Sequence, residues 1–256
     1  MPEPAGGWPE ILRMQGVRKA FRDRQVLAGI DLSLRGCQTL SVLGASGGGK
    51  STLLRLLAGL VKPDAGQIFL FGKDIAPLRE RDLVPVRKRI GVVFQGAALF
   101  DSLTVFDNIA FPLRLHTRIS EDEIRLRVAG LLERVGLPGI EERHPAELSG
   151  GMAKRVGIAR ALVLGPELVL FDEPTAGLDP GSARMICELI VELRRDICET
   201  SVVVTHDLQC AFASSDEIAF LHQGEIIEVA QPKDFRRSPR PEVQRFLEGT
   251  WSRSTS

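Results

Sequence analysis

One stretch near the start of the chain, residues 44–51, restricts its fold more than any other. Its sequence, GASGGGKS, fits the pattern G-x-x-x-x-G-K-[ST]. The apolar residues 39–43 before it indicate a buried strand, and residues 50–58 after it have the pattern of a helix. Glycines let the backbone curl so that its N–H groups face phosphate oxygens, and the start of a helix adds partial positive charge. The stretch therefore predicts a phosphate-binding loop in an α/β sheet.

The side chains of this loop predict how a nucleotide is held. Lys50 can place its ammonium against the β- and γ-phosphates, and the Ser51 hydroxyl can ligate Mg²⁺. A chance glycine-rich turn is the alternative, but the strand and helix on either side argue against it. The residues that we expect to contact the nucleotide here are Gly44, Ala45, Ser46, Gly47, Gly48, Gly49, Lys50, Ser51 and Thr52.

Two later apolar runs end in residues suited to phosphate hydrolysis. Residues 168–171 lead into Asp172 and Glu173, of which the first can hold Mg²⁺ and the second can polarise an attacking water. Residues 201–205 lead into His206, which we expect to contact the γ-phosphate. Open α/β sheets bind ligands at the carboxyl ends of their strands, so all these groups should meet at one edge. An acidic helix cap and a structural histidine remain the simpler alternatives.

With these motifs in place, the chain resembles the ATP-binding-cassette (ABC) ATPases over nearly its whole length. Phe21 falls where that family has an aromatic ring, more often Tyr, that stacks on adenine; this chain has no Tyr. The other positions that match family motifs are Gln95 (Q-loop), Ser149, Gly150, Gly151 and Met152 (signature), Asp179 (D-loop) and His206 (switch histidine).

The resemblance implies an α/β P-loop NTPase fold, with an ABC ATPase core, an antiparallel β subdomain over the base and an inserted helical subdomain. We expect one domain over residues 1–251, with the helical subdomain at about 96–160, a C-terminal extension from about 232, and a disordered tail at 252–256. The implied cofactors are ATP and Mg²⁺, and the signature of a second chain completes the site, so a homodimer is expected. The implied catalytic residues are Glu173, His206 and Lys50, and the implied metal ligands are Ser51, Gln95 and Asp172.

Finer sequence features resemble one branch of this family. Residues 86–89, 94–100, 105–114 and 243–249, together with Met152 in place of the commoner Gln of the signature, are similar to the ATPase of the Mla/MCE-type phospholipid transport system. That resemblance implies a peripheral position on the cytoplasmic face of the inner membrane. The implied partners are a membrane permease, an MCE lipid-binding protein and a small cytoplasmic accessory subunit. An importer of a polar solute, and a soluble ABC ATPase of DNA repair or translation, are the alternatives.

Composition and short patterns set further expectations. The formal net charge is zero, so no electrostatic footprint for nucleic acid stands out. No apolar stretch is long enough to span a bilayer, and the start of the chain lacks the features of a signal peptide. The four cysteines have no metal-binding spacing, and we expect them to be reduced thiols in apolar surroundings.

Two apolar patches leave their partners open. Residues 98–106 can line a groove for the permease or can belong to the core. Near the C-terminus, Val243, Phe246 and Leu247 form a stripe on a predicted short helix, followed by Trp251. This stripe can pack on its own ATPase core or dock onto another subunit.

Overall fold

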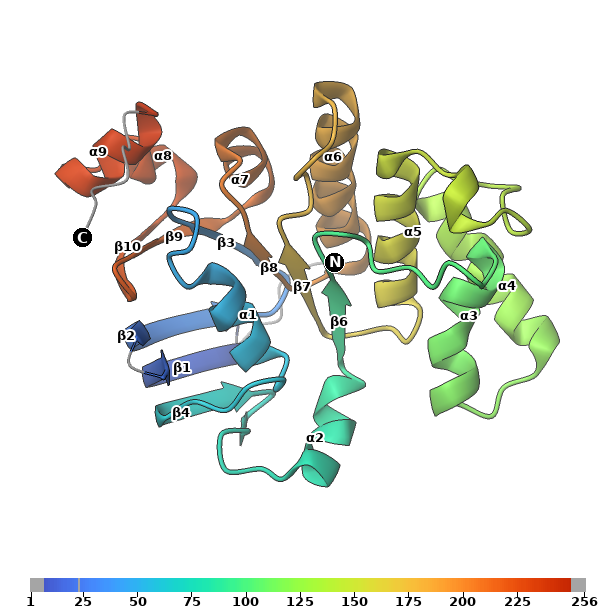
Figure 1. Ribbon diagram of the computed structural model, residues 1–256, viewed down its shortest axis with the longest axis horizontal. Helices are drawn as coiled ribbons and strands as arrows, with labels where there is room; N and C mark the ends of the chain where they lie inside the picture. Colours follow the sequence, from blue (N-terminus) through green and yellow to red (C-terminus); the bar gives the residue numbers. More distant parts are fainter. Residues whose placement is uncertain (1–6, 23, 250–256) are drawn as a thin grey trace.

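The structure, a computed structural model, describes residues 7–22 and 24–249, which form two sheets and a set of helices (Figure 1). The larger sheet has the strand order β10-β9-β3-β8-β7-β6. Neighbouring strands run parallel, except that β10 and β9 form an antiparallel hairpin around Gly224. Its strands are β3 Thr39–Leu43, β6 Ile90–Val93, β7 Leu168–Asp172, β8 Ser201–Val204, β9 Glu217–His222 and β10 Glu225–Ala230.

The smaller sheet is antiparallel, with the order β2-β1-β4-β5. It confirms the antiparallel β subdomain that the family resemblance implies. The turn between its two long strands carries Phe21 at the end of β1. Its strands are β1 Glu10–Phe21, β2 Arg24–Arg35, β4 Ala65–Leu70 and β5 Lys73–Asp74.

Alternation along the parallel strands divides the hydrophobic core into two main clusters. Leu168 and Leu170 of β7 face a cluster that includes the antiparallel sheet and α1. Val169 and Phe171 face the opposite cluster, which includes α3, α4, α5 and α6. The helices are α1 Lys50–Leu57, α2 Glu80–Arg87, α3 Val105–His116, α4 Glu121–Arg134, the short 3₁₀ turn Pro145–Glu147, α5 Gly150–Leu162, α6 Pro180–Ile197, α7 Leu208–Ser214, α8 Pro232–Phe235 and α9 Pro241–Leu247.

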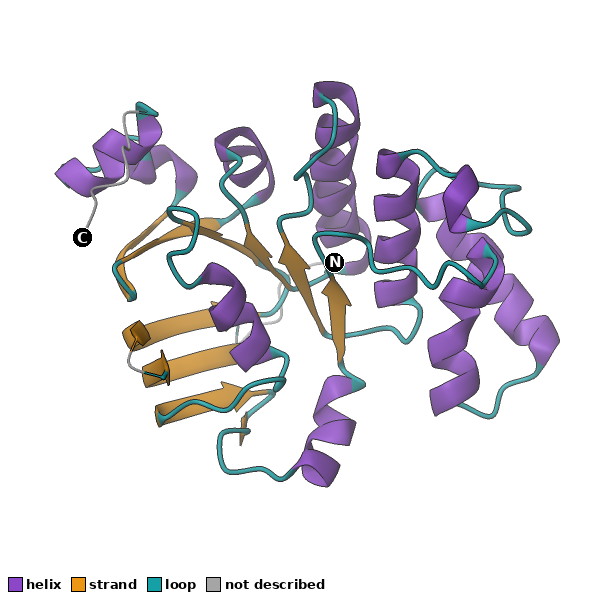
Figure 2. Cartoon of the chain, in the orientation of Figure 1, coloured by secondary structure: helices purple, strands orange, loops and turns teal. Residues whose placement is uncertain are grey.

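The block predicted to be helical contains α3, α4 and α5, which gather at one end of the molecule (Figure 2). The Ser120 side chain accepts a hydrogen bond from the Glu123 N–H at 3.2 Å and so caps the start of α4. Ile124, Val128 and Leu132 of that helix are buried in the core of the block. Between the block and the ATPase core, α5 packs against β6 and α6.

The C-terminal helices α8 and α9 lie over the β9–β10 end of the large sheet. Val243 is fully buried in a cluster with Leu43 and Phe220, and the Phe246 ring lies 5.0 Å from that of Phe220. The apolar stripe of α9 therefore packs on the large sheet of its own chain. Trp251 and the predicted tail at 252–256 lie outside the described residues.

The cysteines correct one expectation. They are paired as disulfides, Cys37 with Cys198 and Cys187 with Cys210, with Cα–Cα separations of 4.6 and 5.3 Å. The first pair joins the β2–β3 turn to the α6–β8 loop, and the second joins α6 to α7. Because 161 residues separate Cys37 from Cys198, spacing along the chain gave no sign of this pairing.

Within the described residues, no helix is both long and apolar enough to cross a membrane.

Candidate functional site

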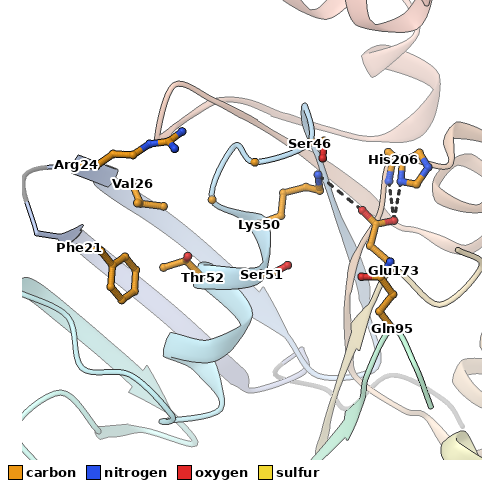
Figure 3. A pocket seen from close by; sticks show the side chains of 12 residues that line it. Phe21, Arg24, Val26, Ser46, Lys50, Ser51, Thr52, Gln95, Glu173 and His206 are labelled. Atoms are coloured by element: carbon orange, nitrogen blue, oxygen red, sulfur yellow. Dashed lines mark hydrogen bonds and ion pairs between the residues drawn. The ribbon is translucent and has the colours of Figure 1, made fainter. Parts of the chain in front are cut away.

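A pocket of about 620 Å³ opens at the carboxyl ends of the parallel strands, next to the β1–β2 turn (Figure 3). Strands β3, β6, β7 and β8 each deliver residues to it, as the rule for open α/β sheets predicts. The residues that line it are Phe21, Arg24, Val26, Ser46, Gly47, Gly49, Lys50, Ser51, Thr52, Gln95, Glu173 and His206.

The phosphate-binding loop is shaped by glycines where the backbone is crowded. A Cβ on Gly44 would lie 2.4 Å from the Leu221 carbonyl oxygen, and Gly49 has a φ of 102° beside Leu27. No other residue fits either position without displacing a neighbouring strand. Gly49 then leads directly into α1, whose first residue is Lys50. The loop and the start of α1 therefore form one concave surface of backbone N–H groups.

Lys50 is 6% exposed and points back across the loop. Its Nζ donates hydrogen bonds to the carbonyl oxygens of Gly44 and Ala45, at 2.9 and 3.2 Å, and lies 3.8 Å from Glu173 Oε1. Burial lowers the Lys50 pKa, while the nearby carboxylates of Glu173 and Asp172 act to raise it. These contacts place one ammonium between the loop and the acidic end of β7.

Oxygen ligands suited to Mg²⁺ meet beside the loop. The Ser51 hydroxyl donates to Asp172 Oδ1 at 3.2 Å, and Gln95 lines the same pocket. Burial raises the Asp172 pKa, whereas a bound cation would favour the ionised carboxylate. A hydroxyl, a carboxylate and an amide are hard oxygen ligands, so the three side chains fit Mg²⁺.

Glu173 and His206 form the most tightly organised pair in the pocket. Glu173 Oε2 lies 2.8 Å from His206 Nδ1 and accepts a hydrogen bond from the His206 backbone N–H at 3.2 Å. Glu173 also has a φ of 48°, a conformation that non-glycine residues rarely adopt. Its own N–H donates to the Val204 carbonyl oxygen at 2.8 Å. The end of β7 and the end of β8 thus hold this carboxylate facing the pocket.

At the opposite end of the pocket, Phe21 is 43% exposed and offers a free ring face for a planar base. Lys19 lies 5.3 Å from the centre of that ring. Sequence reasoning missed Arg24 and Val26, which line the pocket beside it. The signal that could have found them is the tight β1–β2 turn, because Arg24 pairs directly with Phe21.

The structure does not bring the signature residues or Asp179 to this pocket. The Ser149 side chain caps α5 by accepting a hydrogen bond from the Met152 N–H at 3.3 Å. The Asp179 side chain caps α6 by accepting one from the Ser182 N–H at 3.0 Å. Ser149, Gly150 and Asp179 are exposed. One chain therefore contains two separate parts of the predicted site.

Sequence reasoning also missed two polar groups behind the pocket. Thr175 donates to Asp207 Oδ2 at 3.0 Å, which links the segment after β7 to the segment after β8. Lys154 of α5 is 5% exposed and reaches the ends of both β6 and β7. A lysine within a helix carries no sequence signal for such a role, since it is usually exposed.

Comparison with known proteins places the chain in a family. The model of the ABC transporter family matches residues 27–176, which is more than half of the chain. The MlaF ATP-binding protein of the intermembrane phospholipid transport system of Haemophilus influenzae is 40% identical over 227 residues, covering 89% of this chain and 86% of that protein. The methionine import ATP-binding protein MetN of Mesorhizobium japonicum is 38% identical over 240 residues, covering 94% of this chain. The chain spans 66% of the length of that MetN.

Solved structures agree with the family match. The dimeric ATP-binding cassette MJ0796 in a post-hydrolysis state with ADP and Pi has a TM-score of 0.80 and 31% identity, covering 87% of this chain and 99% of that one. CbiO1 of Clostridium perfringens, part of an ABC transporter complex, has a TM-score of 0.82 and 32% identity, covering 93% and 94%. The chain therefore belongs to the ABC transporter family and carries the ATP-binding, ATP-hydrolysing domain of that family.

Proposed function

We propose that this chain is the ATPase of a transporter that moves phospholipids between the inner and outer membranes. The observation that carries the proposal is the 40% identity to a phospholipid-transport ATP-binding protein over 89% of this chain. The branch features at Met152 and in residues 94–100 and 105–114 support the same assignment.

In the proposed mechanism, the loop backbone and Lys50 bind the phosphates of ATP, and Phe21 stacks on adenine. Glu173 accepts a proton from the attacking water and orients it, since its carboxylate faces the pocket. His206 holds Glu173 Oε2 at 2.8 Å and contacts the γ-phosphate from the same side. Lys50, Glu173 and His206 follow three different strands of the parallel sheet, β3, β7 and β8, so their meeting depends on the order and register of that sheet.

Mg²⁺ would be held by Ser51, Gln95 and Asp172, and it supplies positive charge to the phosphates when bound. The protein contributes the positions of these three oxygen ligands. Gln95 follows β6 and leads into the helical block, so it is the ligand best placed to sense movement of that block.

We further propose that two chains share each ATP site. The signature residues Ser149, Gly150, Gly151 and Met152 of one chain, of which Ser149 and Gly150 are exposed, would close over the γ-phosphate bound by the other, with Asp179 beside them. The N–H groups of a helix start suit a phosphate oxygen, and Ser149 and Gly150 lie at the start of α5. ATP binding would then draw the chains together, and hydrolysis would release them.

The permease would dock on the helical block near residues 98–106. Phe100 there is 47% exposed, and its ring lies 5.3 Å from that of Phe111, which is also exposed. Such paired aromatic side chains are suited to anchoring a partner helix. Docking on the permease would hold the chain on the cytoplasmic face of the inner membrane. An MCE lipid-binding protein and a small accessory subunit would complete the complex.

Import of a polar solute is the second candidate, favoured by 38% identity to a methionine import protein over 240 residues. Purification of the intact membrane complex through a tag on this chain distinguishes the two functions. We expect mass spectrometry to find an MCE-type protein and bound phospholipid. Recovery of a polar-solute permease without a lipid-binding partner would overturn the lipid assignment and leave the ATPase mechanism standing.

A further inference from the structure

Lys154 lies within α5, close to the signature end of that helix, yet its side chain points into the ATPase core and not toward solvent. It is 5% exposed. Its Nζ donates a short hydrogen bond to the Gln95 carbonyl oxygen and a second one, at 3.3 Å, to the Glu173 carbonyl oxygen. These two residues follow β6 and β7, which are neighbours in the parallel sheet. One buried ammonium thus joins the helical block to both strand ends that face the nucleotide.

The backbone around these carbonyl groups needs external support. Glu173 has a φ of 48°, and Ala97 and Ala98, just after Gln95, have φ values of 58° and 50°. Left-handed conformations at non-glycine residues are unfavourable and persist only where neighbouring groups hold them. Lys154 supplies one such contact to Glu173 from outside the sheet, opposite the Val204 carbonyl oxygen that accepts from the Glu173 N–H.

The rest of α5 holds the Q-loop segment in the same way. Arg160 donates to the carbonyl oxygens of Ala97 and Ala98, each at 2.8 Å. Gly157 lies close enough to Ala97 that an added Cβ would be 3.3 Å from its carbonyl oxygen. Residues 95–98 and α5 are therefore tightly joined, and Lys154 extends this connection to Glu173.

We propose that Lys154 is a positioning residue for ATP hydrolysis: it fixes the backbone of Glu173 to that of Gln95 and to the signature helix. This inference rests on the role proposed above for Glu173. In the nucleotide-bound dimer, the start of α5 contacts the partner's ATP, while Lys154 on the same helix sets the direction of the Glu173 carboxylate in its own chain. Movement of the helical block is thereby transmitted to the general base without any contact between Lys154 and the substrate.

The neighbouring Arg155 provides a matched control. It lies on the same helix and also donates to two carbonyl oxygens, those of Val135 and Gly136, each at 3.1 Å. Those groups belong to the end of α4, away from the nucleotide pocket. Arg155→Met therefore removes a half-buried cation and a comparable pair of hydrogen bonds without touching Glu173 or Gln95.

Steady-state ATPase measurements on the purified full-length chain test the proposal. We expect Lys154→Met to lower kcat by about tenfold to a hundredfold, since a small displacement of a catalytic group has effects of that size. KM for ATP should change less than about threefold, because Lys154 contacts no phosphate-binding residue of the loop. Lys154→Arg should recover much of the rate, since a guanidinium can also donate to two carbonyl oxygens. Arg155→Met should keep the wild-type kcat even if it lowers the melting temperature as much.

A double-variant cycle separates positioning from general damage. If Lys154 acts through Glu173, then adding Lys154→Met to Glu173→Gln should lower the residual rate little further. Equal losses of kcat in Arg155→Met and Lys154→Met, unchanged kcat in Lys154→Met, or additive losses in the double variant would each overturn the proposal. Near-normal hydrolysis by Glu173→Gln alone would instead overturn the proposed role of Glu173, and with it this inference.

Discussion

At the scale of single residues, Glu173 is the proposed general base, and its replacement gives the sharpest test. Glu173→Gln keeps the shape and a hydrogen bond to His206 but removes the proton acceptor. We expect ATP binding to persist and hydrolysis to fall by about 10²–10⁴-fold, the usual contribution of a general base. Nucleotide binding by fluorescence and phosphate release under the same conditions measure the two effects separately.

Lys50→Ala is the contrasting control for that experiment. Its loss removes the ammonium next to the loop carbonyl oxygens, so nucleotide binding or positioning itself should fail. A Glu173→Gln protein with near-normal turnover would show that another group activates the water. Unchanged affinity and rate in Lys50→Ala would contradict the phosphate-loop assignment.

Glu199 is a second residue with a measurable consequence. It is 5% exposed, neither of its carboxyl oxygens has a hydrogen-bond partner, and burial raises its pKa to about 8. Between its ordinary pKa of 4.5 and about 8, the folded state therefore binds a proton that the unfolded state does not. Stability should fall as pH rises through this window, by on the order of 4 kcal/mol between pH 5 and pH 9.

Urea denaturation of wild type and Glu199→Gln across that pH range tests the dependence. The amide cannot ionise, so the variant should lose most of the downward slope, whatever its stability at any one pH. Glu192→Gln, on the exposed side of α6, is the control and should keep the wild-type slope. Parallel slopes in wild type and Glu199→Gln would contradict the assignment.

The residues at the site differ in how far the sequence could predict them. Lys50, Ser51 and Glu173 belong to motifs in which local backbone geometry fixes the chemistry, and the pocket contains all three. Arg24 could have been found from the tight β1–β2 turn, which pairs it with Phe21, but Lys154 could not be predicted, because its position depends on how α5 packs against segments distant in the chain. The burial of Glu199 could not be predicted either, because a glutamate is usually exposed and its type carries no signal for burial.

At the scale of elements, α5 is the helix on which the proposed sharing of sites depends. Ser149→Asp tests it without loss of the helix cap, since Asp is as good an N-cap as Ser. Its charge should repel the partner's γ-phosphate, so the variant alone should be nearly inactive. Mixed with inactive Lys50→Ala chains, it should regain up to about a quarter of the wild-type rate, because half of randomly paired dimers are mixed and each has one intact site.

Ser149→Asn, which caps equally well and adds no charge, is the control and should stay active. Ser149 is a better position for this test than Gly151. A Cβ at Gly151 would lie 2.9 Å from Ser182 Oγ of the same chain and would disturb the contact between α5 and α6. Failure of the mixture to recover any activity would contradict a site shared between chains.

Most boundaries of helices and strands could be predicted from the sequence, but the surfaces against which these elements pack could not. The cap at Ser120, the stripe of α4 and the apolar strands β3, β7 and β8 follow from local patterns. By contrast, the choice between self-packing and docking for α9 required the structure, because an apolar stripe does not specify which surface covers it. The structure shows Val243 buried against Leu43, the last residue of β3.

At the scale of the whole molecule, the two cysteine pairs are long-range restraints. Cys37–Cys198 closes a loop of 161 residues, for which about 2–4 kcal/mol of stabilisation is typical. We expect the non-reduced, denatured protein to contain no alkylatable thiol by mass spectrometry, and reduction to release four. Reduction should also lower the urea midpoint, and Cys37→Ala/Cys198→Ala should abolish most of that change.

Full alkylation of the non-reduced protein would contradict the pairing and restore the expectation of free thiols.

The sequence could not predict either cysteine pair, for the same reason that it could not predict the sheet order β10-β9-β3-β8-β7-β6. Both depend on which distant segments become neighbours, whereas the α/β class and the two-sheet layout follow from patterns within short windows.

The distance between the pocket and the signature end of α5 in one chain has a kinetic consequence. If neither chain can complete its own site, hydrolysis requires an encounter of two chains. In dilute solution, without a permease to hold the chains together, the total rate should then rise with the square of the protein concentration. Tethering two chains on one permease would replace that dependence with a fixed local concentration. The membrane complex would thus determine the rate of ATP hydrolysis as well as its location.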